Sequence, residues 1–193
     1  MKINYRKIYS GPLIFQTRVV EEHLKEIEKL CTKDADKEAN KSLAGIIDEE
    51  FFIDKNKIQE ILHVYLLAHQ QAFKEWYLNW PVPKLKCVTS WVNYMKSGES
   101  NPIHVHHGCE WSSVLFLKFP NKILEEQKKF KGSAFKPGNL VFTFSLDMKN
   151  QICNHEYTPQ RGDFFLFPSN VYHSVPSYKS DCERISVACN FKE

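Results

Sequence analysis

The sequence predicts a mainly β fold with helices in its N-terminal part. Two observations carry this prediction. From Lys86 onward, short runs rich in β-branched and aromatic residues follow one another, and turn-forming residues separate them. Before Lys86, apolar residues recur at helical spacing. Many short strands at regular intervals are typical of a barrel or a sandwich, so we expect helices packed on such a structure.

Two helices are expected in the first part of the chain. Apolar residues recur every three or four positions from Val20 to Cys31, which predicts the first helix. The second helix is expected to begin at Asp54, a favoured N-cap residue, and to carry an apolar stripe from Ile58 to Trp76. Prolines follow from position 81 and end it.

The rest of the chain is expected to hold the β structure. The predicted strands cover 87–95, the stretch around 103–106, 111–119, 139–146, 162–168 and 184–191. Two polar stretches, 31–45 and 121–139, are expected to be loops and are candidates for lids over a site. We expect 1–193 to form a single domain, with a helical support region at 1–84 and the β core at 85–193, because neither part is expected to fold alone.

Composition limits the classes of partner and location. The formal net charge is only +3 and the basic residues are scattered, which argues against nucleic acid as a partner. No apolar run reaches the length of a membrane span, and the first residues lack the apolar stretch of a secretory signal. The sequence therefore predicts a cytoplasmic protein. Its six cysteines form no CxxC pair and are expected to be thiols, with Cys109 as the one that could lie near a metal.

Three histidines are candidate metal ligands. His104 and His106 are two positions apart, so on a strand their side chains project from the same face. Neutral imidazole suits iron, zinc, copper and nickel. His173 follows a predicted strand and a short turn after Pro168, which can return the chain to the His104 strand. We therefore expect one metal site, the alternative being ordinary polar residues on a sheet surface. The other histidines are expected to be such residues: His23, His63, His69, His107 and His155.

Arg184 is a candidate anion-binding residue. It shares one face of a predicted strand with Ser186, Ala188 and Asn190. An arginine on a strand otherwise suited to a core needs an anionic partner. Its guanidinium can bind a carboxylate through two parallel hydrogen bonds, and Ser186 could add a hydroxyl. The alternative is a surface strand with Arg184 solvated at its start.

These residues together resemble the iron(II)/2-oxoglutarate oxygenases, whose pattern is HxD/E, a distal histidine and then RxS. The chain is most similar to a group of bacterial and bacteriophage oxygenases. The motifs that carry the resemblance are SWVN (90–93), NPIHVHHG (101–108), SSVLFL (112–117), FPSNVYH (167–173), ERISVACN (183–190) and SLAG (42–45). The resemblance implies a double-stranded β-helix, the jelly-roll or cupin-like barrel.

The resemblance also implies a reaction. Fe(II) would be held by His104, His106 and His173, with no catalytic residue beyond these ligands. 2-Oxoglutarate would bind the metal and place its distal carboxylate on Arg184 and Ser186. With O2, its decarboxylation to succinate would be coupled to oxidation of a C–H bond in a substrate that the sequence does not identify.

Two further residues are expected in the pocket, and one position differs from the family pattern. Trp91 and Asn93, on one face of the first barrel strand, are expected to line the pocket, with Asn93 near the cosubstrate. His106 stands where the family has its carboxylate ligand, and Glu110 is the alternative third ligand.

The same run of residues also resembles the cupins, so a cupin-type metalloenzyme without 2-oxoglutarate is the second hypothesis. A metal-free barrel that only binds a partner is the third. Arg184 separates the first two hypotheses, because only the first assigns it a ligand.

Overall fold

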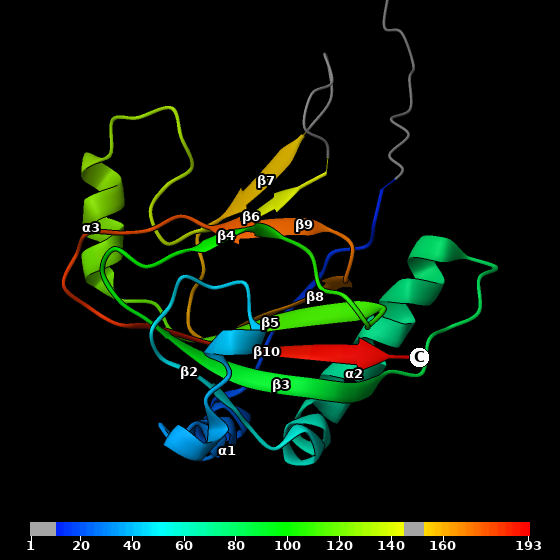
Figure 1. Ribbon diagram of the computed structural model, residues 1–193. Helices are drawn as coiled ribbons and strands as arrows, with labels where there is room; N and C mark the ends of the chain where they lie inside the picture. Colours follow the sequence, from blue (N-terminus) through cyan, green and yellow to red (C-terminus); the bar gives the residue numbers. More distant parts are fainter. Residues whose placement is uncertain (1–10, 145–152) are drawn as a thin grey trace, which may run out of the picture.

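A computed structural model describes residues 11–144 and 153–193. Two antiparallel sheets lie face to face, with helices on the outside (Figure 1). The larger sheet contains β1 (Phe15–Arg18), β8 (Asp163–Pro168), β5 (Trp111–Lys118), β10 (Arg184–Lys192), β3 (Lys86–Met95) and β2 (Glu50–Phe52), in that order. The smaller sheet contains β4 (Asn101–His104), β9 (Tyr172–Val175), β6 (Leu140–Thr143) and β7 (Asn154–Tyr157). The prediction of a mainly β chain with few helices is confirmed.

The first two helices cover the outer face of the larger sheet. In Figure 1, α1 (Glu21–Leu30) lies below this sheet, and α2 (Lys55–Tyr77) runs behind its strands. The side chain of Asp54 accepts hydrogen bonds from the first backbone N–H groups of α2, which confirms it as the N-cap. Ile27 of α1 and Ile58 of α2 are fully buried in one cluster with Val92 and Leu115 of the sheet. Burial of this apolar surface holds the helices on the sheet.

A second apolar cluster fills part of the space between the sheets. Its buried members include Phe116 of β5 and Phe165 and Phe167 of β8, which meet Leu140 and Phe142 of β6. Side chains alternate along each strand, so residues such as Leu115 face the helices while Phe116 faces the other sheet. The remaining space between the sheets is the cavity described below.

Several elements differ from those predicted. β4 ends at His104, so His106 lies beyond the strand, and His173 lies on β9 rather than in a turn. The stretch 121–139 contains α3 (Asn121–Lys129), and 31–45 contains two short 3-10 helices. β7 was not predicted. The part of the predicted strand 139–146 that follows Phe144 lies outside the described residues.

The N-terminal part is not only helical. β1 pairs with β8, and β2 pairs with β3, so two strands of the larger sheet come from residues before 84. Within the ranges that the structure describes, no helix is both long enough and apolar enough to cross a membrane.

Candidate metal centre

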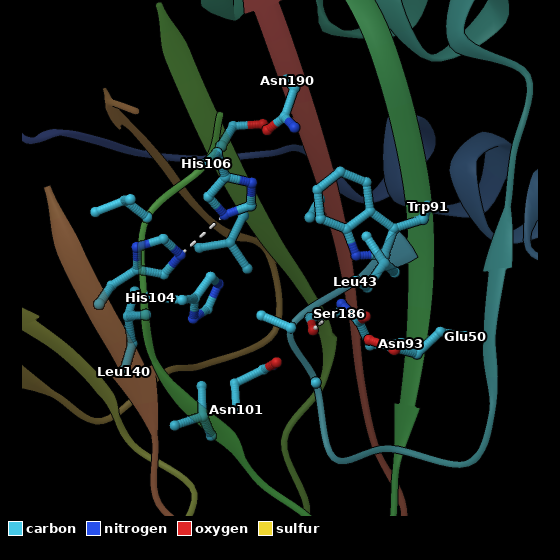
Figure 2. Close-up of a pocket in the computed structure, with 18 of the residues that line it drawn as sticks. Leu43, Glu50, Trp91, Asn93, Asn101, His104, His106, Leu140, Ser186 and Asn190 are labelled. Carbon is cyan, nitrogen blue, oxygen red and sulfur yellow. Dashed lines mark hydrogen bonds between the residues drawn. The ribbon is translucent and has the colours of Figure 1, made fainter. Parts of the chain in front are cut away.

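A cavity of about 320 Å³ lies between the two sheets. The larger sheet contributes side chains from β2, β3, β5, β8 and β10. The smaller sheet contributes residues that include His173, and His104 and Leu140, which Figure 2 labels. The segment 42–45 lies at its mouth, where Ser42 and Ala44 are exposed. Cavities of this size and mixed lining are typical of small-molecule sites.

Three imidazoles meet in this cavity. His104, the last residue of β4, pairs in register with His173 of β9, and His106 follows two residues later. The ligand nitrogens of the three side chains lie within 4.8 Å of one another. The Nε2 atoms of His106 and His173 are 3.1 Å apart. Two nitrogens that bind one ion at a right angle, each at about 2.1 Å, would lie about 3.0 Å apart, so this spacing fits a shared metal ion.

Hydrogen bonds fix which nitrogen of two imidazoles carries the proton. Nδ1 of His104 lies 2.7 Å from the carbonyl oxygen of Pro102, and Nδ1 of His173 lies 3.0 Å from that of Val171. A carbonyl only accepts hydrogen bonds, so each Nδ1 donates and the lone pair is on Nε2. This outer hydrogen bond is the one that metal-binding histidines usually make.

The electrostatic environment keeps the three imidazoles neutral. Burial lowers the pKa of His106 to about 4, lowers that of His104, and lowers that of His173 well below its usual value, with the neighbouring histidines adding to the effect on His106 and His173. A hydrogen bond with the side chain of Asn190 acts in the opposite direction on the pKa of His106. Neutral imidazoles are the form that binds a metal, so the cluster is suited to a divalent cation.

Arg184 is a buried cation without an acidic partner. Its side chain is 1% exposed. None of the ion pairs among the described residues includes it. Nη1 lies 3.4 Å from Oγ of Ser186, the guanidinium lies 4.8 Å from the ring centre of Phe116, and Nε has no hydrogen-bond partner. The alternative in which Arg184 is solvated is therefore wrong. Burial lowers its pKa to about 10, so it is still charged at neutral pH. A buried charge without a counterion indicates that a ligand supplies the anion.

Asn93, Trp91 and Ser186 line the same cavity, as expected. In the β3–β10 pairing Asn93 is opposite Ser186. Nδ2 of Asn93 donates to Oγ of Ser186 at 3.4 Å. The ring of Trp91 stacks on His106, with centroids 5.7 Å apart. The structure therefore brings the three histidines, Arg184 and their predicted neighbours to one place.

Glu110 does not belong to this group. It is exposed, lies outside the cavity lining, and accepts a hydrogen bond from the backbone N–H of Glu193 at 3.3 Å. In the part of the chain that the structure describes, the cluster that could hold a metal ion contains the three histidines and no carboxylate. Cys109 is also outside the cavity lining, and its Sγ lies 3.8 Å from Oγ of Ser112.

The two predicted lid segments differ. Residues 42–45 of the first segment line the cavity, whereas none of 121–139 does. In the second segment, Glu126 of α3 accepts hydrogen bonds from the backbone of Lys179 and Ser180. The stretch 121–139 therefore packs against another loop, away from the site.

Sequence reasoning missed the acidic residue of the cavity, Glu50 of β2. It is 1% exposed and lies opposite Asn93 in the β2–β3 pairing. In the sequence it is the third of three consecutive acidic residues, 48–50, a run that indicates a solvated surface. The available signal was Phe51 and Phe52 directly after it, because two adjacent aromatic residues favour a strand with one side buried.

Comparisons with known proteins agree with this geometry. The family model described as "Putative 2OG-Fe(II) oxygenase" matches residues 89–190, more than half of the chain. No curated protein sequence matches the chain significantly.

Solved structures with the same fold include a prolyl-4-hydroxylase from Pseudomonas putida, with 16% identity, 93% of this chain and 92% of that chain covered, and a TM-score of 0.57. An oxidoreductase of the 2OG-Fe(II) oxygenase family from Burkholderia pseudomallei has 15% identity, covers 94% and 84%, and has a TM-score of 0.55. A viral collagen prolyl hydroxylase from Paramecium Bursaria Chlorella virus-1, in its 2OG complex, has 10% identity, covers 92% and 94%, and has a TM-score of 0.54.

The family match decides among the three hypotheses drawn from the sequence. It favours the first over a cupin-type enzyme without 2-oxoglutarate and over a metal-free binding barrel. This chain belongs to the 2OG-Fe(II) oxygenases, enzymes that use Fe(II), 2-oxoglutarate and O2.

Proposed function

We propose that His104, His106 and His173 hold the Fe(II) of this oxygenase, and that Arg184 and Ser186 bind the distal carboxylate of 2-oxoglutarate. The observation that carries the proposal is the presence, in one cavity, of three converging neutral imidazoles and a buried guanidinium without a counterion. A divalent cation would take the place of the hydrogen bond between Nε2 of His106 and Nε2 of His173, which are 3.1 Å apart, and a carboxylate would neutralise the guanidinium.

The side chains around these groups have positioning roles. Asn93 donates to Ser186, which leaves the hydroxyl hydrogen of Ser186 free to donate to the cosubstrate carboxylate. Asn190 and Trp91 hold the ring of His106 from two sides. When bound, Fe(II) and 2-oxoglutarate supply the oxidation of a substrate C–H bond by O2, with release of CO2 and succinate. The protein orients these reactants and excludes water from the space between the sheets.

Residues 104, 106 and 173 are proposed as ligands in preference to Glu110. The separation of Glu110 from the cavity supports this choice. A set of three imidazoles gives the centre one negative charge fewer than the HxD/E pattern does. The consequence is a metal site that holds its anionic cosubstrate with more net positive charge.

The fold and its organisation are part of the same proposal. Two facing antiparallel sheets with the site between them support a double-stranded β-helix barrel. One domain over 1–193 is supported by β1 and β2, which tie the N-terminal part into the larger sheet.

Cosubstrate turnover tests the proposal. The purified chain, incubated with Fe(II), 2-oxoglutarate and O2, should release succinate, and removal of Fe(II) by a chelator should stop the release. His173→Ala should lose both Mn(II) binding and succinate release. His155→Ala is the matched control, because His155 is exposed on β7, and it should retain both. Metal binding that survives in His173→Ala would refute the ligand assignment.

The substrate is a separate question. The solved structures named above are at most 16% identical to this chain, so their likeness extends to the fold and not to what they hydroxylate. The lining of the cavity beside the cosubstrate position is the better guide.

A further inference from the structure

Glu50 is the one acidic side chain that lines the cavity among the described residues. It is 1% exposed, its Oε2 has no hydrogen-bond partner, and no ion pair in the described part of the chain includes it. Burial raises its pKa to about 7, and the nearby Glu99 adds to this shift. A buried carboxyl group without a donor or a cation is unfavourable, so a partner from outside the chain would stabilise it.

A second unpartnered acceptor lies beside Glu50. Oδ1 of Asn93 has no hydrogen-bond partner, and this residue is only 5% exposed. Glu50 and Asn93 are opposite each other on neighbouring strands, so their side chains lie on the same face, and Figure 2 shows them next to each other. Nδ2 of Asn93 is used by Ser186, so the oxygen is the free end of the amide. The two residues form an acceptor pair.

The position of this acceptor pair fits a substrate that lies next to the cosubstrate. Across the sheet, Asn93 separates Glu50 from Ser186, the residue proposed to bind 2-oxoglutarate. On its other side, Glu50 is covered by the segment 42–45 at the mouth of the cavity. A Cβ atom added to Gly45 would lie 2.8 Å from Oε1 of Glu50. The acceptor pair is therefore between the mouth and the cosubstrate position.

We propose that Glu50 and Asn93 bind the primary substrate, and that the group they bind is a cation with N–H donors, an ammonium or a guanidinium. This inference rests on the proposed binding of 2-oxoglutarate at Arg184 and Ser186. The reasoning is the same at both ends of the cavity: an unpaired guanidinium matches an anionic cosubstrate, and an unpaired carboxyl group matches a cationic substrate. An ammonium has three N–H donors and a guanidinium has five, enough for both acceptors, whereas a neutral hydroxyl has one donor and leaves the carboxylate without a counterion.

Glu50 has a competing role that the experiment must separate. Because His106 replaces a carboxylate ligand, an ionised Glu50 could instead balance the charge of Fe(II). In that case its loss would weaken binding of the metal and of 2-oxoglutarate. Under our proposal, loss of the Glu50 carboxylate weakens binding of the cationic group and leaves the affinities for the metal and for 2-oxoglutarate unchanged.

The test uses the full chain loaded with Mn(II) and 2-oxoglutarate without O2. The probes are n-butylamine and n-butylguanidine, with butan-1-ol as the neutral control, and titration calorimetry measures their affinity. We expect at least one cationic probe to bind about tenfold or more tightly than butan-1-ol, the ratio expected for a hydrogen bond to a charged group. Glu50→Gln should remove this preference. Glu110→Gln, the same change outside the cavity, should retain it.

Each outcome decides the proposal. Equal affinity of the cationic probes and butan-1-ol for the unaltered chain would overturn it, and this comparison needs no variant to fold. An unchanged preference in Glu50→Gln would also overturn it, as would weakened Mn(II) or 2-oxoglutarate binding in that variant without a change toward the probes. Failure of the unaltered chain to bind Mn(II) and 2-oxoglutarate in the same titrations would count against the proposed function instead.

Discussion

Replacement of Arg184 by methionine should stabilise the ligand-free protein and greatly reduce its stabilisation by 2-oxoglutarate. Burial lowers the pKa of Arg184 from 12.5 to about 10. That difference means that the buried, charged guanidinium lowers the free energy of unfolding at neutral pH by about 3 kcal/mol. Methionine keeps an apolar, unbranched side chain next to Met95 and Phe116 without this charge. Arg184→Met should therefore be at least as stable as the unaltered chain when no ligand is present.

The same replacement should weaken the binding of 2-oxoglutarate. Removal of one partner of a buried, hydrogen-bonded charge pair costs about 2–5 kcal/mol, so the Kd for 2-oxoglutarate should rise by about 30-fold or more. At 100 times its Kd, the cosubstrate should stabilise the unaltered chain by about 2.7 kcal/mol. At that concentration Arg184→Met should gain less than about 1 kcal/mol.

Urea unfolding with Mn(II), with and without 2-oxoglutarate, measures both effects. The control is Arg161→Met, which removes a half-exposed arginine that pairs with Glu21 and Glu28 away from the cavity. It should keep the full response to 2-oxoglutarate. Our reasoning is refuted if Arg184→Met is less stable without ligand and still responds to 2-oxoglutarate as the unaltered chain does.

Three other predictions follow from the same contacts. Asn190→Ala removes the hydrogen bond that orients His106, so Mn(II) affinity measured by titration should fall about tenfold, and an unchanged affinity would exclude this role. The pKa of Glu50 is raised in the fold from 4.5 to about 7, so its contribution to stability is complete below about pH 4.5 and is lost as the pH rises through about 7. Relative to Glu50→Gln, the unaltered ligand-free chain should lose about 3 kcal/mol of unfolding free energy over this range in urea titrations; parallel curves would contradict the shift. Gly45→Ala places a Cβ atom 2.8 Å from Oε1 of Glu50, so the end of this side chain must shift, and stability should fall by no more than about 1 kcal/mol in the same assay, whereas a loss of about 3 kcal/mol would show that the carboxyl group is fixed in place.

The residues of the candidate metal centre could be brought together by prediction because each carries a local signal. The spacing of His104 and His106 predicted a shared direction, and the structure brings both rings together with His173. We expected His104 and His106 to lie on one strand. In the structure β4 ends at His104, and the segment after the strand brings His106 to the same place. Alternation along β10 predicted that Arg184 and Ser186 face one way, and both line the cavity.

The elements that were missed lack such signals. β7 has polar side chains on both faces and lies at the edge of its sheet, so no apolar alternation marks it. α3 is a short helix whose sequence, NKILEEQKK, contains only two apolar residues, so the stretch has the polar composition of a loop. Glu50 is placed in the cavity by pairing with β3, about forty residues later in the chain. Such long-range pairing decides which of three consecutive acidic residues turns inward, and a local pattern does not contain that information.

A crystal structure of the chain with Fe(II) and 2-oxoglutarate, prepared without O2, tests the central claim most directly. We predict iron bonded to Nε2 of His104, His106 and His173 at about 2.1 Å, and a carboxylate of 2-oxoglutarate paired with Arg184. Iron bonded to a carboxylate of the protein in place of His106, or 2-oxoglutarate bound without contact to Arg184, would contradict the assignment.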